Sequence, residues 1–157
     1  MKLKNKTAVV TGAGSGFGAG IARRFAEEGA CVVVADINEK NGLKVANQIS
    51  SSGGKAEFVF VDVSDGKSYE NLIVRTTKIF GCLDILVSNA GWAYSNKPST
   101  EVSESDFDKL FNVNVKSIYF GAVYAVKAMK EQGKGGLLLN IASTAAARPR
   151  PNLTWYN

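Results

Sequence analysis

A glycine-rich turn near the start of the chain has the residue types and spacing of a phosphate-binding loop. Residues 11–18 read Thr-Gly-Ala-Gly-Ser-Gly-Phe-Gly, and they lie between a short apolar run and a helical pattern. Glycine permits the positive φ angles of a tight turn and lets the backbone approach a pyrophosphate. The helix that follows points its free N–H groups and its positive dipole end at the anion. This placement predicts a dinucleotide site, whereas a plain loop is the alternative. The residues assigned to the cofactor are Thr11, Gly12, Gly14, Ser15, Gly16, Phe17 and Gly18.

An acidic residue, Asp36, directly follows the second apolar run. A carboxylate at this point can accept hydrogen bonds from both hydroxyls of an adenosine ribose, and it repels a 2′-phosphate. Neither Ser15 nor Ile37 offers the positive charge that such a phosphate would need. Asp36 and Ile37 therefore predict NAD as the cofactor, with NADP disfavoured. A helix N-cap or a turn is the alternative role for Asp36.

Two more polar motifs follow the third and fourth apolar runs. Asp62 and Val63 suit an adenine pocket, in which the carboxylate meets the exocyclic amine and the valine meets the ring. Asn89 can tie adjacent strands through side-chain to backbone bonds, and Ala90 and Gly91 leave room for a cofactor. Aspartate and asparagine at strand ends are also ordinary turn residues, so turns remain the alternative for both motifs.

A long helical pattern covers residues 104–132, and Asn114 falls on its apolar stripe. The other members of the stripe are Phe107, Leu110, Phe111, Ile118, Ala122 and Ala125. A buried amide needs hydrogen-bond partners. Asn114 is therefore either satisfied inside the core or the mark of a helix irregularity that holds a water.

Ser143 follows the fifth apolar run, and Tyr156 lies thirteen residues later. The carboxyl ends of the strands are where ligands bind in open α/β folds, which places Ser143 at the expected site. Each residue alone is an unremarkable polar side chain. Pro149 and Pro151 predict an irregular tail over residues 143–157 until near Trp155.

The elements that must position these residues alternate along the chain. The apolar runs are residues 7–11, 31–35, 56–61, 83–87 and 135–142. A helical pattern follows the glycine-rich turn of residues 12–20 and stops at Gly29, and further helical patterns cover residues 39–49, 65–80 and 104–132. Strand–helix alternation at this spacing predicts parallel strands with right-handed crossovers. We therefore expect one α/β domain over residues 1–157. It should be a doubly wound, Rossmann-like sheet of strand order 3-2-1-4-5.

Composition excludes several other classes of function. The net charge is +5, but the 19 Lys and Arg residues are scattered, so no nucleic-acid partner is expected. The chain has no His, and Cys31 and Cys82 lie beside strand-like runs, which predicts two small core residues and no metal site. No apolar stretch is long enough for a signal peptide or a membrane span, so the chain is expected to be cytoplasmic, with no membrane partner.

Together these motifs, in this order, resemble the short-chain dehydrogenase/reductase family, including bacterial 3-oxoacyl-carrier-protein reductases and sugar or alcohol dehydrogenases. The resemblance implies hydride transfer between NAD and a small alcohol or carbonyl substrate. It implies that Tyr156 is the general acid/base, that Ser143 holds the substrate oxygen and that Asn114 supports a water. It also implies a homo-oligomer, a dimer or tetramer, that uses the long helix.

Two departures from the family pattern shape the expectations. Position 88 is Ser where the family usually has Asn, and the catalytic Lys expected four residues after Tyr156 lies beyond residue 157. The chain is therefore expected to be the amino-terminal portion of a family member, with later strands missing, an open edge at the fifth strand and little or no activity by itself. A non-catalytic NAD-binding module is the alternative. Trp92, Tyr94, Arg148 and Trp155 are candidates for the substrate side of the site.

Overall fold

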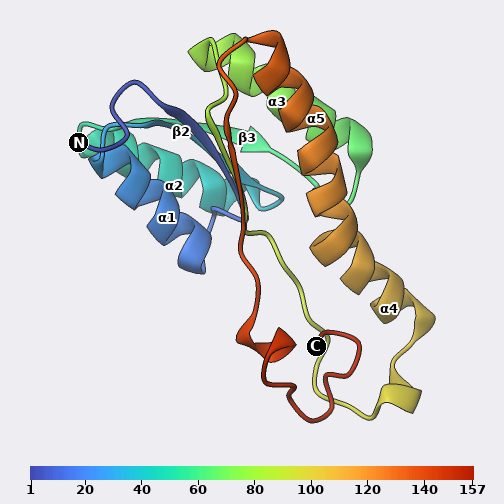
Figure 1. Cartoon of the computed structure of the whole chain (residues 1–157). Coiled ribbons are helices and arrows are strands. Elements are labelled where there is room, and N and C mark those ends of the chain that lie inside the picture. Colours follow the sequence, from blue (N-terminus) through green and yellow to red (C-terminus); the bar gives the residue numbers. More distant parts are fainter.

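The computed structural model describes all residues, 1–157, and contains a single five-stranded parallel sheet of order β3-β2-β1-β4-β5 (Figure 1). This confirms the predicted fold and strand order. The strands are β1 (Thr7–Thr11), β2 (Cys31–Asp36), β3 (Lys55–Phe60), β4 (Ile85–Ser88) and β5 (Leu137–Asn140). β3 starts and ends one residue before the predicted run, and β5 is shorter than predicted because only Leu137–Asn140 pair with β4.

Helices cover both faces of the sheet, with α1 and α2 on one side and α3 and α5 on the other (Figure 1). The helices are α1 (Gly16–Glu27), α2 (Glu39–Ser51), α3 (Gly66–Phe80), α4 (Glu104–Phe111) and α5 (Ser117–Glu131). A π-helical segment, η2 (Asn112–Lys116), joins α4 to α5, and two short 3₁₀ turns are η1 (Ser99–Glu101) and η3 (Thr144–Ala146).

Alternation along the strands divides the core into two layers. Val10 and Val34 pack with the helices α1 and α2, whereas their neighbours Val9 and Val33 pack with α3 and α5. Successive side chains of a strand point to opposite faces, so a strand that is buried on both faces must be apolar throughout. This explains the continuous Val-rich runs of β1 and β2. It also fixes the carboxyl ends of these strands at one edge, where the polar motifs follow.

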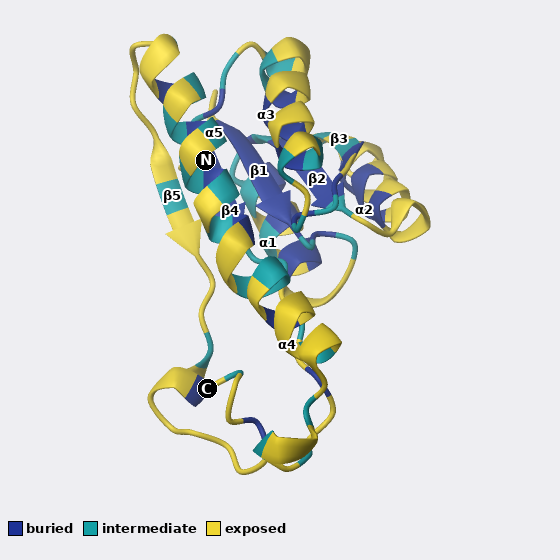
Figure 2. Cartoon of the chain, turned by 90° about the vertical axis from the view of Figure 1, so that its right-hand side faces the viewer, coloured by how far each residue is buried: buried dark blue, intermediate teal, exposed yellow.

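Strand β5 lies at the open edge of the sheet, and its side chains are largely exposed (Figure 2). Leu137 is 55% exposed and Leu139 is 41% exposed. An exposed apolar edge strand is a template for pairing with another strand. The predicted open edge at the fifth strand is therefore present.

The long helix is interrupted, which the single predicted helix over residues 104–132 did not anticipate. Segment η2 contains wider, π-type turns, and such a turn rotates the residues before it relative to those after it. Leu110 and Ala125 are buried as predicted, but Phe107 and Phe111 are exposed to 36% and 41%. The prediction that these two residues belong to a buried apolar stripe was therefore wrong, because one 3.6-residue period does not run through the π segment.

Two smaller predictions about burial also need correction. Cys31 and Cys82 are free and only half-buried, so they are not fully enclosed core residues. On α3, Tyr69, Leu72, Ile73 and Thr76 are buried as expected, but Ile79 is 39% exposed. Burial raises the pKa of Tyr69 to about 12, against an opposing effect of the neighbouring Ser88 hydroxyl.

Asp84 anchors the amino ends of β1 and β4. Its carboxylate accepts hydrogen bonds from the Thr7 N–H at 2.8 Å and from Lys6 Nζ at 3.3 Å. Burial alone would raise the pKa of Asp84, but the bonds from Thr7 and Lys6 outweigh it and hold the pKa below its ordinary value. This end of the sheet lies opposite the edge that carries the glycine-rich turn.

Beyond the sheet, the segment after β4 and the end of the chain lie side by side (Figures 1 and 2). The Lys97 N–H donates to Asn152 O at 3.1 Å, and the Trp155 N–H donates to Tyr94 Oη at 3.0 Å. Tyr94 is buried with Leu110 and Leu153 in a small separate cluster. Apart from η3, the tail lacks regular structure, as predicted.

Candidate functional site

The loops at the carboxyl ends of β1, β2, β3 and β4 surround a cavity of about 520 Å³. Every residue that the sequence assigned to the cofactor lines this cavity, except Thr11 and Gly14. The residues in the lining are Gly12, Ser15, Gly16, Phe17, Gly18, Asp36, Ile37, Val61, Asp62, Val63, Asn89, Ala90, Gly91, Trp92, Lys109 and Val113. We call this cavity the carboxyl-edge cleft.

The glycine-rich turn forms one wall of the cleft. Gly12 and Gly16 have φ angles of +64° and +53°, a region that side-chain-bearing residues rarely adopt. Gly18 is buried, and a Cβ there would collide with Gly12 O and with the Asn89 amide. No side chain caps the first turn of α1 and no acidic residue lies in it, so its free N–H groups remain available to an anion.

Asp36 links the turn to β2. Its Oδ2 accepts the Gly14 N–H at 2.8 Å, and its Oδ1 accepts the Asn38 N–H at 2.8 Å. Asn38, not Asp36, caps α2. Each carboxylate oxygen can accept a second hydrogen bond, so Asp36 keeps acceptor capacity on the cleft side. Gly14 therefore supports the site from behind rather than lining it.

Thr11 and Asn89 join the ends of β1 and β4. Asn89 Nδ2 donates to Thr11 O at 2.9 Å and to Gly12 O at 3.3 Å. In return Thr11 Oγ1 accepts the N–H groups of Asn89 and Ala90 at 3.0 and 3.1 Å. The predicted tie between adjacent strands is therefore present, and it fixes the turn against the residues after β4.

Asp62 and Val63 form the far end of the cleft, after β3. Asp62 Oδ1 accepts the N–H and the hydroxyl of Ser64, at 2.9 and 2.6 Å. This is the local turn chemistry that the sequence left open as the alternative. The bonds involve only one carboxylate oxygen, and Val63 is buried beside it.

Asn114 lies in η2 and makes two hydrogen bonds with one residue of the loop after β4. Its Oδ1 accepts the Trp92 N–H at 2.8 Å, and its Nδ2 donates to Trp92 O at 2.7 Å. The amide is therefore satisfied, and it also sits in a helix irregularity. The water that Asn114 was expected to hold stays a prediction.

Ser143 and Tyr156 lie outside the carboxyl-edge cleft. Ser143 Oγ accepts the Ala145 N–H at 3.1 Å and caps η3. Tyr156 packs against the small cluster of Tyr94, Leu110 and Leu153. The structure thus brings the cofactor residues together but does not add this pair to the same cavity.

Sequence patterns missed one pair in the cleft. Lys109 Nζ lies 4.5 Å from the centroid of the Trp92 ring, and both side chains line the cavity. Nothing in the spacing of these residues indicates the contact, because it depends on the path of the loop after β4 and on the π segment.

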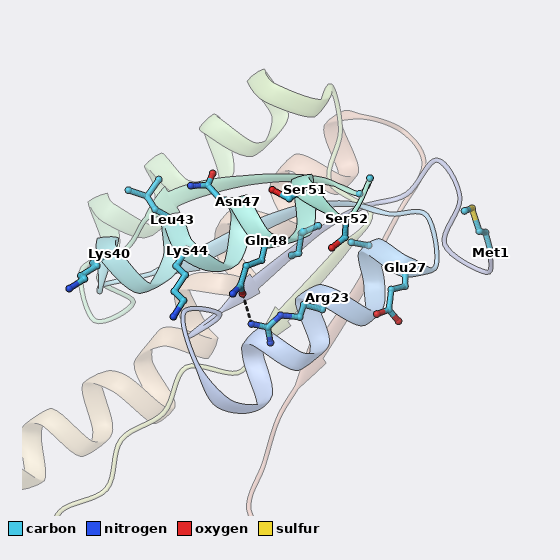
Figure 3. Close-up of a pocket in the computed structure, with 14 residues that line it drawn as sticks. Met1, Arg23, Glu27, Lys40, Leu43, Lys44, Asn47, Gln48, Ser51 and Ser52 are labelled. Carbon is cyan, nitrogen blue, oxygen red and sulfur yellow. Dashed lines mark hydrogen bonds between the residues drawn. The ribbon is translucent and has the colours of Figure 1, made fainter.

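The largest hollow on the molecule is elsewhere, in the groove between α1 and α2 (Figure 3). It is an open groove lined largely by polar and charged residue types, and the hydrogen bond from Arg23 to Gln48 Oε1, 2.9 Å long, spans it. It contains none of the glycine-turn residues and none of the other residues assigned to the cofactor. The smaller carboxyl-edge cleft is therefore the candidate site.

No group of three or more His, Cys, Asp or Glu side chains is arranged to hold a metal ion. None of the helices combines the length and the apolar character that crossing a membrane requires.

The fold agrees with comparisons to known proteins. The short chain dehydrogenase family matches residues 6–157. The chain is 41% identical, over its whole length, to 4-formylbenzenesulfonate dehydrogenase TsaC1/TsaC2 of Comamonas testosteroni, and 36% identical over 98% of its length to L-2,3-butanediol dehydrogenase of Corynebacterium glutamicum. A crystal structure of 3-ketoacyl-(acyl-carrier-protein) reductase from Brucella melitensis, complexed with NADH, superposes with a TM-score of 0.92 at 39% identity over 98% of this chain.

The chain therefore belongs to the short-chain dehydrogenase family, a family of oxidoreductases. It spans 62% and 60% of the two dehydrogenases and 63% of the reductase, about three fifths of each.

Proposed function

We propose that this chain provides the cofactor-binding part of an oxidoreductase that moves a hydride between NAD and an alcohol or carbonyl carbon. The observation that supports this most is the carboxyl-edge cleft. There an uncapped helix start, a glycine-rich turn and the Asp36 carboxylate face one cavity. The residues present fit a dinucleotide, because free N–H groups suit its diphosphate and a carboxylate suits its ribose. NAD, when bound, supplies the hydride acceptor.

The choice of NAD over NADP rests on charge at the end of β2. Asp36 and Ile37 line the cleft together, and a 2′-phosphate on the ribose would meet the Asp36 carboxylate. Ser15 and Ile37 carry no compensating charge. The NADH-bound Brucella reductase supports a nicotinamide cofactor for this family member.

For the catalytic step, we assign the proton at the substrate oxygen to the Tyr156 hydroxyl and a hydrogen bond to the same oxygen to Ser143. Asn114 holds the loop after β4 and supports a water. In the structure of these 157 residues, Ser143 is engaged in its own turn and Tyr156 packs outside the cleft. We therefore expect the polypeptide 1–157 by itself to bind NAD without measurable turnover.

The substrate class follows from the relatives, which act on an aromatic aldehyde, a diol and a ketoacyl group by their names. All three are alcohol or carbonyl compounds. We propose a small molecule of this class for the present protein. Trp92, in the cleft lining, and the 45% exposed Trp155 are candidates to contact it.

A homo-oligomer is the proposed state, with the long helix as its interface. The exposed apolar side chains Val115, Tyr119 and Val123 recur every four residues from the end of η2 along α5. Residues four apart lie on one face of a helix. A second copy of the same helix would cover this face.

An enzyme assay tests the proposal. A full-length family member that contains these 157 residues should oxidise alcohols or reduce carbonyl compounds from a test panel, and the absorbance of the reduced nicotinamide cofactor should change accordingly. Tyr156→Phe should abolish the change while leaving NAD binding intact. Binding without any turnover in that longer protein would instead support a non-catalytic NAD-binding module.

A further inference from the structure

Lys109 is the only basic residue in the lining of the carboxyl-edge cleft. The acidic residues of the same lining are Asp36 and Asp62. The side chains alone therefore give the cleft a formal charge of −1, although its proposed ligand carries a diphosphate. The helix N-terminus of α1 compensates part of this charge. Lys109 is the one side chain that can compensate more.

Lys109 forms no direct ion pair in the protein, although its charge helps to lower the pKa of Asp106, whose carboxylate is bound by Lys97. Lys97 is paired with Asp106 at 2.8 Å, and Lys6 is paired with Asp84 at 3.3 Å. None of the five ion pairs in the structure includes Lys109. Its ammonium lies over the Trp92 ring instead. Such contacts are weak where solvent reaches them, so the ammonium remains free to take an anion.

Trp92, whose ring lies under the Lys109 ammonium, is fixed by hydrogen bonds to its backbone. Asn114 binds both the N–H and the C=O of Trp92, as described above. Lys109 and Asn114 belong to the same stretch of helix, α4 and η2, so the helix positions both the ring and the ammonium above it. Val113 lines the cleft beside them.

We propose that Lys109 is a cofactor-binding residue, whose ammonium, placed by Trp92, contacts the diphosphate of a dinucleotide in the carboxyl-edge cleft. The inference rests on the proposed function, because it assumes that the ligand of the cleft is a dinucleotide. It adds a cation from α4 to a site otherwise built from strand ends and the start of α1. The proposed role of Lys109 is to bind the diphosphate, and it takes no part in proton transfer.

Calorimetry with ADP and with adenosine tests this directly. Lys109→Met should weaken ADP and NAD binding about 5-fold at low salt, and adenosine binding should not change because adenosine has no phosphate. Added salt should narrow the difference between the variant and the wild type, because exposed charges are screened. Lys109→Arg keeps the positive charge and should bind ADP and NAD like the wild type. The adenosine titration controls for loss of structure, since a folding defect at this position would weaken adenosine binding too.

Lys116 provides the matched control. Its Nζ lies 5.6 Å from the Phe120 ring, but Lys116 does not line the cleft. Lys116→Met should bind ADP like the wild type. ADP binding by Lys109→Met equal to the wild type, or an equal loss for adenosine, would overturn the assignment of Lys109. Absence of NAD binding by the wild type would be a different failure, that of the proposed function itself.

Discussion

The side-chain amide of Asn114 makes two hydrogen bonds with the backbone of Trp92, accepting its N–H at 2.8 Å and donating to its C=O at 2.7 Å. These two residues lie on different elements, the π segment η2 and the loop after β4. The pair therefore ties the long helix to the carboxyl-edge cleft. It also explains why a polar residue occupies the helix where a regular apolar stripe would run.

Asn114→Ala should lower the free energy of unfolding by about 1–3 kcal/mol, because it leaves the Trp92 N–H and C=O without partners. Urea denaturation measures this. Asn112→Ala is the matched control, since Asn112 belongs to the same π segment and makes no side-chain hydrogen bond. Equal losses for the two variants would show that the Trp92 bonds are not the cause.

Gly18→Ala should destabilise the chain by about 1–3 kcal/mol and weaken NAD binding, because the added methyl group collides with Gly12 O and the Asn89 amide. Gly20 lies two residues on in the same helix and has open space around it. Gly20→Ala should therefore raise stability, by about 0.5–1 kcal/mol. If both substitutions stabilised α1, the close approach at Gly18 would be refuted.

Thr11→Val keeps the shape of the side chain but removes the hydroxyl that two N–H groups use. We expect a loss of about 1–3 kcal/mol in thermal or urea unfolding, since Asn89 and Ala90 would then have unpaired donors. Thr11→Ser retains the hydroxyl and should recover most of the stability. A valine variant as stable as the wild type would show that the hydroxyl of Thr11 does not stabilise the chain through these two N–H groups.

The pH dependence of the free energy of unfolding should show how much the ionised Asp84 carboxylate stabilises the fold. Hydrogen bonds hold its folded pKa below the unfolded value of about 3.9. The stability it contributes is therefore fully present above the unfolded pKa and is lost as the pH falls through the folded pKa. Asp84→Asn should be less stable than the wild type at pH 7, and the difference should close in acid.

Glu57→Gln is the control for Asp84, because Glu57 is exposed on β3 and makes no ion pair. Its stability should follow that of the wild type at every pH. If the stability difference between Asp84→Asn and the wild type stayed constant from neutral to acid pH, the charge of Asp84 would not be the cause of that difference.

Strand order and the gathering of the polar motifs at one sheet edge were predictable from the sequence. Short Val-rich runs such as residues 31–35 are typical of strands buried on both faces, and alternation with helices makes them parallel. Once the sheet is parallel, Asp36, Asp62 and Asn89 must meet at its carboxyl edge. The turn at Gly12 and Gly16 follows from the φ angles that only glycine adopts readily.

The long helix shows what sequence periodicity could not predict. A single helical period places Phe107 and Phe111 inward, but the π segment rotates them outward, where they contact each other with ring centroids 4.5 Å apart. Asn114 in the π segment bonds to Trp92, a residue 22 positions away, and such a long-range contact leaves no mark in the local periodicity. The Lys109–Trp92 contact depends on the same geometry, so the sequence alone contains no signal for it.

Calorimetric titration of this chain with NAD and with NADP tests the central claim most directly. We expect measurable heat and a dissociation constant for NAD well below that for NADP. Replacing the Asp36 carboxylate, as in Asp36→Ser, should reduce this preference. No heat with either nucleotide would contradict the assignment of the carboxyl-edge cleft as a dinucleotide site.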